Sequence, residues 1–201
     1  MKILVIGVSS QTSVGYLLAQ HLKDHEFIFA SRSGKLGEAC DVTNNEAVAA
    51  LIFRIKPDVV IHAAGFYREE TLGNIQDWQA ASSNVLAKAF GALVVLNEAV
   101  KNAVPIVIFF GGKMEHADPL FAPFVVGNGA MLVAVRFAAE HSSVQAYYLE
   151  MGLIIGSSMG KLIQGRGQGV HDEEVHIETL AQVVQGIISG SYANGSQIVL
   201  Y

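Results

Sequence analysis

The sequence predicts an α/β fold in which one doubly wound parallel sheet lies between two layers of helices. Short runs of β-branched and aliphatic residues alternate with longer segments whose apolar residues recur at helical spacing. The short runs are apolar on both faces, which is typical of parallel strands covered by helices. Hydrophobic residues make up 51% of the chain and charged residues 15%, so a large buried core is expected. The length of 201 residues indicates one domain, spanning residues 1–201.

The first strand, turn and helix are the most clearly marked elements. Residues 3–6 form an apolar run that ends at Gly7, and residues 14–22 follow as an amphipathic helix. Strands separated by helices pair in parallel through right-handed crossovers. The segment 156–174 contains several glycines and is a candidate for a mobile segment over a pocket. Further strands are expected at 27–30, 59–61, 106–110, 145–149 and 197–200, and further helices at 46–55, 78–102, 123–140 and 177–188.

Charge and hydropathy limit the possible function classes. A net charge of −5 gives no basic surface for nucleic acid. Gly, Pro or a charged residue interrupts each apolar run before it reaches the roughly 18 residues needed to cross a bilayer. The N-terminus does not resemble a signal peptide. We therefore expect a cytoplasmic protein with neither a nucleic-acid partner nor a membrane partner.

A metal site is not expected. Cys40 is the only cysteine, which excludes an internal disulfide and disfavours a cysteine metal site. His171 and His176 lie near an acidic run at 172–174, but their spacing matches no established metal site. This histidine-containing segment is interpreted as solvated.

The loop between the first strand and the first helix is a candidate phosphate-binding turn. Backbone N–H groups and the helix dipole at the start of a helix favour a pyrophosphate group. The three glycine positions of the dinucleotide-binding fingerprint fall on Gly7, Ser10 and Ser13, and Gly15 follows one turn later. Serine resists the positive φ that glycine adopts, although its hydroxyl can bind a phosphate. A generic serine-rich turn is the alternative. The candidate phosphate-binding residues are Gly7, Ser9, Ser10, Gln11, Thr12 and Ser13.

Three further patches occur in the order and spacing of a known family. Asp41-Val42-Thr43 follows the second strand, His62-Ala63-Ala64-Gly65 follows the strand at 59–61, and Asn84 lies in the long helix. Together with the N-terminal turn, these patches make the chain resemble the short-chain dehydrogenase/reductase family from end to end. The resemblance implies a single Rossmann-like NAD(P)-binding domain with three layers, α/β/α. It also implies oxidoreductase activity on a carbonyl or alcohol substrate.

The resemblance also implies which residues hold the cofactor. Asp41 matches an aspartate that meets the adenine ring, and Gly152 matches a Pro-Gly turn that contacts the nicotinamide carboxamide. At 31–33 no acidic residue stands where an NAD enzyme holds the ribose hydroxyls, whereas the Arg32 guanidinium can pair with a 2′-phosphate. NADP is therefore favoured over NAD, and a solvated arginine is the alternative. These implied cofactor-binding residues are Arg32, Asp41, Val42, Ala63, Ala64, Gly65 and Gly152.

The serine, tyrosine and lysine that the family uses for catalysis are missing from their expected positions. Counted from Asn84, which matches the family's asparagine, these positions fall on Gly111, Phe124 and Asn128. A phenylalanine has no proton to give, and loss of a positioned acid removes about 10² to 10⁴ of rate. The active site is therefore expected to be atypical.

Other side chains are candidates to replace the missing groups. Lys113 and His116 follow the strand at 106–110, whose carboxyl end is where ligands bind in such sheets. His116 could act as an acid near neutral pH, and Lys113 could hold an anionic substrate. Tyr67-Arg68 could reach the same crevice, although a polar surface loop is the alternative for all four. Tyr147-Tyr148 lies on an expected core strand and is interpreted as packing on its two faces.

Three hypotheses for the function follow. The first is an atypical oxidoreductase that uses NADP(H) and an acid other than tyrosine. The second is a catalytically inactive NADP-binding sensor or scaffold. The third is an interaction surface that has lost the nucleotide because Ser10 and Ser13 close the turn. The sequence does not identify a substrate.

The family resemblance also implies a homodimer or homotetramer. Members of the family commonly pair the helices equivalent to 78–102 and 123–140 across two-fold axes. Small residues on the second of these helices would permit a close approach between copies, or would instead face the sheet. These residues are Gly127, Gly129, Ala130, Ala134 and Ala138.

Overall fold

A parallel seven-stranded sheet forms the centre of the protein. The computed structural model describes residues 1–65, 70, 73–114, 122–164 and 174–200. The strand order is β3-β2-β1-β4-β5-β6-β9, and every neighbouring pair is parallel. The strands are β1 (Lys2–Ile6), β2 (Glu26–Ser31), β3 (Glu38–Ala39), β4 (Val59–His62), β5 (Ile106–Gly112), β6 (Gln145–Met151) and β9 (Gln197–Leu200). This architecture confirms the predicted fold class.

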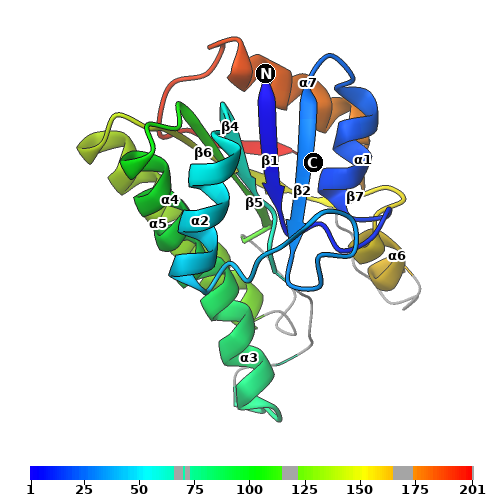
Figure 1. Ribbon diagram of the computed structural model, residues 1–201. Coiled ribbons are helices and arrows are strands. Elements are labelled where there is room, and N and C mark those ends of the chain that lie inside the picture. Colours follow the sequence, from blue (N-terminus) through cyan, green and yellow to red (C-terminus); the bar gives the residue numbers. More distant parts are fainter. Residues whose placement is uncertain (66–69, 71–72, 115–121, 165–173, 201) are drawn as a thin grey trace.

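Helices cover both faces of the sheet (Figure 1). One face carries α2 (Asn45–Ile55), α4 (Gly91–Lys101) and α5 (Ala122–His141), and the other carries α1 (Val14–His21) and α7 (Ile177–Ile188). Helix α3 (Trp78–Val85) runs through a five-residue π-helical turn, η1 (Leu86–Phe90), directly into α4. The two faces bury separate hydrophobic clusters, so the fold has three layers.

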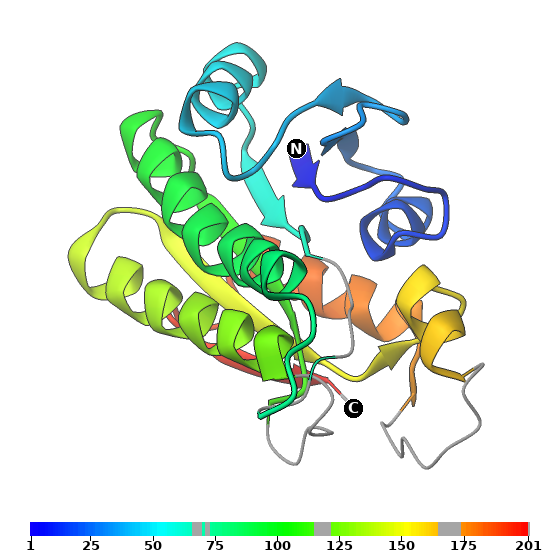
Figure 2. The same cartoon turned by 90° about the horizontal axis from the view of Figure 1, so that it is seen from below.

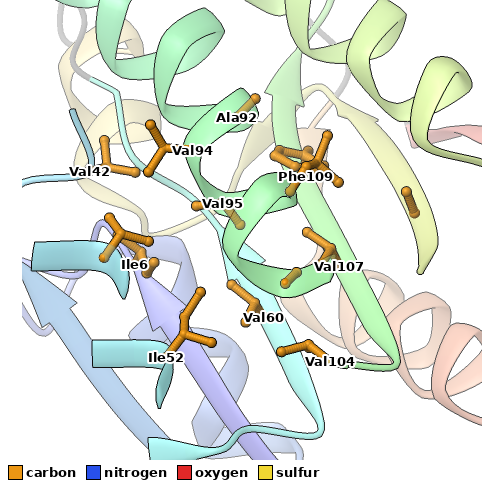
Figure 3. Close-up of a cluster of buried hydrophobic side chains, with 14 of the residues drawn as sticks. Ile6, Val42, Ile52, Val60, Ala92, Val94, Val95, Val104, Val107 and Phe109 are labelled. Carbon is orange, nitrogen blue, oxygen red and sulfur yellow. The ribbon is translucent and has the colours of Figure 1, made fainter. Parts of the chain in front are cut away.

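The first cluster is densest where β1, β4 and β5 meet α2 and α4 (Figure 3). Ile6, Val60 and Val107 come from the three strands and are at most 1% exposed. Ile52 of α2 and Val95 of α4 pack on them from the helix layer and are fully buried. Burial of one such side chain contributes about 1.5–3 kcal/mol relative to exposure. This packing fixes the ends of β1 and β4, which position the site described below.

The predicted elements were found within a few residues of their expected bounds, and several short ones were missed. The helix expected at 78–102 contains the π turn, which the apolar spacing did not reveal. Inside the segment 156–174, where mobility was predicted, the structure places α6 (Ser158–Gln164); residues 165–173 lie outside the described part. A separate two-stranded parallel sheet joins β7 (Leu153–Ile154) to β8 (Glu174–Val175). Two-residue strands such as β3, β7 and β8 are too short to give a periodic pattern.

Two helical segments are long and apolar enough to cross a membrane, which corrects the expectation that no stretch reaches that length. They are Trp78–Lys101 and Ala122–His141, and 44% and 39% of their apolar windows are buried. Their parts α4 and α5 belong to the layer that covers the sheet, whereas α3 extends beyond the strands (Figure 1). A helix that covers a buried sheet satisfies the same criterion of length and composition, so the finding is weak evidence for a membrane span.

Two glycines in helices are expected to respond in opposite ways to substitution by alanine. A Cβ at Gly15 would lie 2.6 Å from Val5 Cγ1, so Gly15→Ala is expected to lower the free energy of unfolding by about 1–3 kcal/mol. A Cβ at Gly129 meets no described atom within 4 Å, so Gly129→Ala is expected to raise it by about 0.5–1 kcal/mol through helix propensity. Urea unfolding measures both values. Equal effects would contradict the tight contact between α1 and β1.

Candidate functional site

The strand order reverses between β1 and β4, and this switch point opens into a cavity. Ligands bind at the carboxyl ends of the strands at such a point, because the loops that follow diverge to opposite faces. The cavity has a volume of about 410 Å³, within the range of small-molecule sites. Its lining residues are Ile6, Gly7, Ser9, Ser31, Arg32, Ser33, Cys40, Asp41, Val42, Thr43, Ala64, Gly65, Ser83, Leu86 and Ala87.

Gly7 lets the turn after β1 lie directly against the end of β4. Its φ is +114°, and a Cβ on it would fall 2.5 Å from the carbonyl carbon of Ala63 and from the backbone nitrogen of Ala64. The N–H groups of Gly7 and Val8 both donate to Ala30 O, at 2.8 and 3.0 Å. No side chain fits between the two backbones, so glycine is required here for both conformation and space.

The two serines at the other fingerprint positions need no positive φ. Among the described non-glycine residues, only Lys56 and Ala103 have a positive φ, so Ser10 and Ser13 carry no such strain. Ser13 Oγ accepts hydrogen bonds from the N–H groups of Ser9 and Ser10, at 3.3 and 3.1 Å. The tight contact between helix and strand comes from Gly15, one turn later. The resistance of serine to positive φ therefore does not strain this turn.

The hydroxyl groups of this turn also contact α6. Thr12 Oγ1 and Ser158 Oγ are 2.6 Å apart, and Ser158 N donates to Thr12 O at 2.9 Å. Ser10 Oγ lies 3.3 Å from Ser158 Oγ. Gln11, between them, is exposed. Thus Ser10 and Thr12 fix the start of α6 beside the turn, a contact that their sequence positions did not predict.

Arg32 and Asp41 form the outer rim of the cavity. Asp41 Oδ1 accepts hydrogen bonds from the N–H and the hydroxyl of Thr43, at 2.9 and 2.7 Å. The bond from the Thr43 backbone is the main reason why the pKa of Asp41 lies below its usual value, and the nearby Arg32 charge adds to it. Arg32 is exposed and also lines a second cavity of about 300 Å³, which Gln79 and Ser83 border. The rim therefore carries one positive and one negative charge.

Several lining residues come from helices and strand ends that no motif marked. Ser83, Leu86 and Ala87 reach the cavity from α3 and η1, across the sheet edge from the turn. Cys40 lies beneath the rim, where burial raises the pKa of its thiol to about 11, so it stays protonated at neutral pH. These residues are recognisable as a site only when the long helix is packed against the sheet.

His62 and Asn84 are buried at the inner end of this region. His62 Nε2 donates to Ala87 O at 3.1 Å, which ties β4 to the π turn. Burial lowers the pKa of His62 to about 4, so the ring is neutral. Asn84, the residue that matches the family's asparagine, is 1% exposed, and neither of its amide atoms has a partner among the described residues. Such orphaned atoms mark a place where water or a ligand group completes the hydrogen bonding.

The position expected for the catalytic serine is filled from another strand. A Cβ at Gly111 would lie 2.0 Å from the hydroxyl oxygen of Tyr148 on β6. That hydroxyl is buried and has no described hydrogen-bond partner, and burial raises its pKa well above the usual value. As predicted, Tyr147 and Tyr148 pack on opposite faces of the sheet, one in each hydrophobic cluster.

Phe124 and Asn128 lie on α5, where counting from Asn84 predicted the family's tyrosine and lysine positions. The Phe124 ring packs on Gly112, where a Cβ would lie 2.5 Å from Phe124 Cε1. Asn128 Nδ2 donates to Gly112 O at 3.2 Å, while Asn128 Oδ1 is buried without a described partner. Both residues therefore join α5 to the end of β5, and neither supplies a charged group.

Lys88, on the π turn, is the residue that the sequence analysis missed. It is 3% exposed, whereas its neighbours Leu86 and Phe90 are 50% and 44% exposed. Its Nζ lies 4.4 Å from the centre of the Phe124 ring. Burial lowers the pKa of this ammonium group to about 7. A basic group thus stands beside the vacant tyrosine position, although it comes from a different helix from the family's lysine.

The remaining predicted site residues fall outside this arrangement or outside the described residues. Lys113 is partly exposed just after β5. Gly152 follows β6 and donates its N–H to Leu200 O at 2.8 Å, so that group is not available to a carboxamide. His116, Tyr67-Arg68 and His171 lie outside the described residues.

Comparison with known proteins identifies the fold. No protein-family model and no curated protein matches the sequence. The protein lin1944 from Listeria innocua has a structure similar to this chain, with a TM-score of 0.80 and 17% identity over the whole of both chains. A small-chain dehydrogenase in complex with NADPH has a TM-score of 0.79 and 16% identity, covering 99% of this chain and 95% of its own. A mutated uronate dehydrogenase has a TM-score of 0.73 and 14% identity, covering 98% and 73%. This chain therefore has the short-chain dehydrogenase fold.

The two adjacent tyrosines are expected to differ in their contribution to stability. The Tyr147 hydroxyl donates to Gln145 Oε1 and to Tyr192 O, at 3.3 and 3.4 Å, so Tyr147→Phe should lower the free energy of unfolding by about 0.5–1.5 kcal/mol. Tyr148→Phe removes a buried hydroxyl without a described partner and should leave stability unchanged or raise it by about 1 kcal/mol. Urea unfolding of the two variants checks this. A larger loss for Tyr148→Phe would show that its hydroxyl is bonded.

Proposed function

We propose that the protein is an oxidoreductase that binds NADP(H) and acts on a carbonyl or alcohol substrate. The cavity at the switch point between β1 and β4 carries the proposal, because it joins a glycine turn to a charged rim. The short-chain dehydrogenase fold and the NADPH complex of a similar structure support it. We place the reaction in the cytoplasm.

The residues of the crevice fit a dinucleotide. Gly7 leaves its turn free of side chains where a pyrophosphate approaches the backbone. Asp41 and Val42 line the part of the cavity that suits an adenine ring, and Ala64 and Gly65 line the inner end. When bound, the cofactor supplies a hydride donor or acceptor. The chain itself holds the dinucleotide and excludes water from its inner end, where Asn84 and Lys88 are buried.

Arg32 is expected to select NADP(H) over NAD(H). A guanidinium that pairs with a phosphate contributes about 1.5–3 kcal/mol, or roughly 10- to 150-fold in affinity. Arg32→Ala should therefore weaken NADPH binding by at least tenfold and leave NADH binding nearly unchanged, as measured by isothermal titration. Lys35→Ala, which removes another exposed positive charge nearby, is the control. If wild-type protein bound none of NADPH, NADP⁺, NADH and NAD⁺, the proposed function would be rejected.

A catalytically inactive NADP-binding sensor is the second candidate. The observation that favours it is that Gly111, Phe124 and Asn128, the positions predicted for the three catalytic side chains, are occupied by packing and a structural hydrogen bond. The sensor binds NADPH without consuming it over a broad panel of aldehydes and ketones. The oxidoreductase consumes NADPH with at least one of them, so the same titrated protein distinguishes the two candidates.

We also propose that the chain forms a homodimer or homotetramer through the outer faces of α4 and α5, which lie side by side (Figure 2). Gly127, Ala134 and Ala138 are buried inside the chain, so this interface does not rest on the predicted small-residue face. The outward face carries large apolar side chains instead. They are Leu86, Phe90, Leu93, Val126, Val133 and Phe137, each at least 44% exposed.

Phe137→Glu is expected to reduce the assembly to single chains, because a charge would be buried at the interface. Phe53→Glu is the matched control, since Phe53 on α2 is 68% exposed and Phe137 is 65% exposed. Light scattering should give wild type and the control a mass of two or four times 21.5 kDa, and Phe137→Glu the mass of one chain. Monomeric wild-type protein would contradict the assembly.

A further inference from the structure

Lys88 is buried, and its contacts with the described residues do not offset the free-energy cost of removing its ammonium group from water. Among the described residues no carboxylate pairs with its ammonium group. The Phe124 ring at 4.4 Å offers a cation–π contact of about 0.5–2 kcal/mol. Removing an ammonium group from water costs several kcal/mol. Lys88 therefore lowers stability, and a group that lowers stability at a ligand site is a candidate for function.

The surrounding backbone leaves room specifically for this side chain. A Cβ at Gly65 would lie 2.9 Å from Lys88 Cε and 3.3 Å from its Nζ, and a Cβ at Gly127 would lie 2.9 Å from its Cδ. Gly65 also lines the cavity at the switch point. The Lys88 side chain thus extends between α5 and the end of β4, and its amine lies next to the inner end of the cavity.

Lys88 lies on the inward face of the long helix. It follows the buried Asn84 by four residues and precedes the buried Ala92 by four, which is the spacing of one helix face, whereas Leu86 and Phe90 are exposed. Lys88 also lies within the π turn. Single π turns inside helices occur frequently at functional sites. Asn84, four residues earlier, has an unpartnered amide in the same region of the helix.

We propose that Lys88 is the proton donor of this site and replaces the tyrosine whose position Phe124 occupies. The inference rests on the proposed NADP(H)-dependent function. When bound, the dihydronicotinamide would supply a hydride, with its electron pair, to the carbonyl carbon of the substrate, where a C–H bond forms. The carbonyl π electrons move to oxygen, and that oxygen takes a proton from the Lys88 ammonium group. The products are an alcohol, NADP⁺ and a neutral Lys88 amine, which recovers a proton from solvent.

The pH dependence of the reaction has a defined sign. The donor must be protonated, and burial lowers the pKa of Lys88 to about 7. The rate of carbonyl reduction is therefore expected to be highest below this value and to fall tenfold per pH unit above it. His62 is neutral in this range because its pKa is lowered to about 4. The Tyr148 hydroxyl is also neutral, since its pKa is raised. Neither group produces the same profile.

The first test asks whether a small carbonyl compound can reach Lys88 and needs no turnover. Wild-type protein is treated with formaldehyde and cyanoborohydride at neutral pH, with and without NADPH, and lysine methylation is mapped by mass spectrometry. Lys88 should be methylated in the free protein and protected by NADPH, whereas exposed Lys101 is methylated in both. A Lys88 that stays unmodified while Lys101 reacts fully would show a sealed structural side chain and would overturn the inference.

The second test measures single-turnover NADPH oxidation with 4-nitrobenzaldehyde and phenanthrenequinone as probe carbonyls. Lys88→Met should lower the rate at least 100-fold and change the NADPH dissociation constant less than threefold. Lys88→Arg should lose the same rate, because arginine keeps its proton. Lys101→Met, which removes a lysine from the far end of α4, should match wild type. Circular dichroism confirms that each variant is folded.

The outcomes separate the two proposals. Unchanged rates in Lys88→Met, or a wild-type protein that binds NADPH but reduces neither probe, would overturn the role of Lys88 and leave the cofactor site intact. Wild-type protein that binds no NADPH would reject the proposed function, and the role of Lys88 with it.

Discussion

The contact between the turn after β1 and the end of β4 is the constraint on which the site depends. The backbones of Gly7 and Ala63 approach so closely that no side chain fits between them. The contact holds the two strands together while the loops beyond them diverge, and the cavity opens where they part. Ile6 lines this cavity and packs with Val60 and Val107 in the first hydrophobic cluster (Figure 3). The packing of the core therefore determines the position of the crevice.

The two ends of the crevice differ in how closely their residue types match those that the family resemblance implies. At the outer end, the glycine turn, Arg32 and Asp41 keep the residue types that a dinucleotide requires. At the inner end, packing contacts occupy the positions where catalytic side chains were expected. The Tyr148 hydroxyl fills the space at Gly111, and the Phe124 ring covers Gly112. Among the described residues, Lys88 is the only lysine or arginine that is buried there. The proposed cofactor binding and the proposed proton transfer therefore rest on different residues, and each can be tested separately.

The fold could be predicted from the sequence because apolar runs and helical spacing are local signals. The turn at Gly7 was predicted because it directly follows a strand, whereas Asp41, Val42, Ala64 and Gly65 were predicted from the family resemblance. Lys88 was missed because the room for its side chain comes from two glycines far apart in the chain, Gly65 and Gly127. A lysine flanked by apolar residues normally indicates an exposed position. In the turn after β1, Gly7 adopts a positive φ, whereas Ser10 and Ser13 do not.

Nuclear magnetic resonance titration with NADP⁺ tests most directly whether the crevice at the switch point binds the dinucleotide. The account predicts that the backbone amide signals of Gly7, Arg32 and Gly65 shift or broaden together. The signals of Gly129 and Gly190, which lie on α5 and after α7, should stay in place. Shifts confined to residues outside the crevice, or none at saturating NADP⁺, would contradict it.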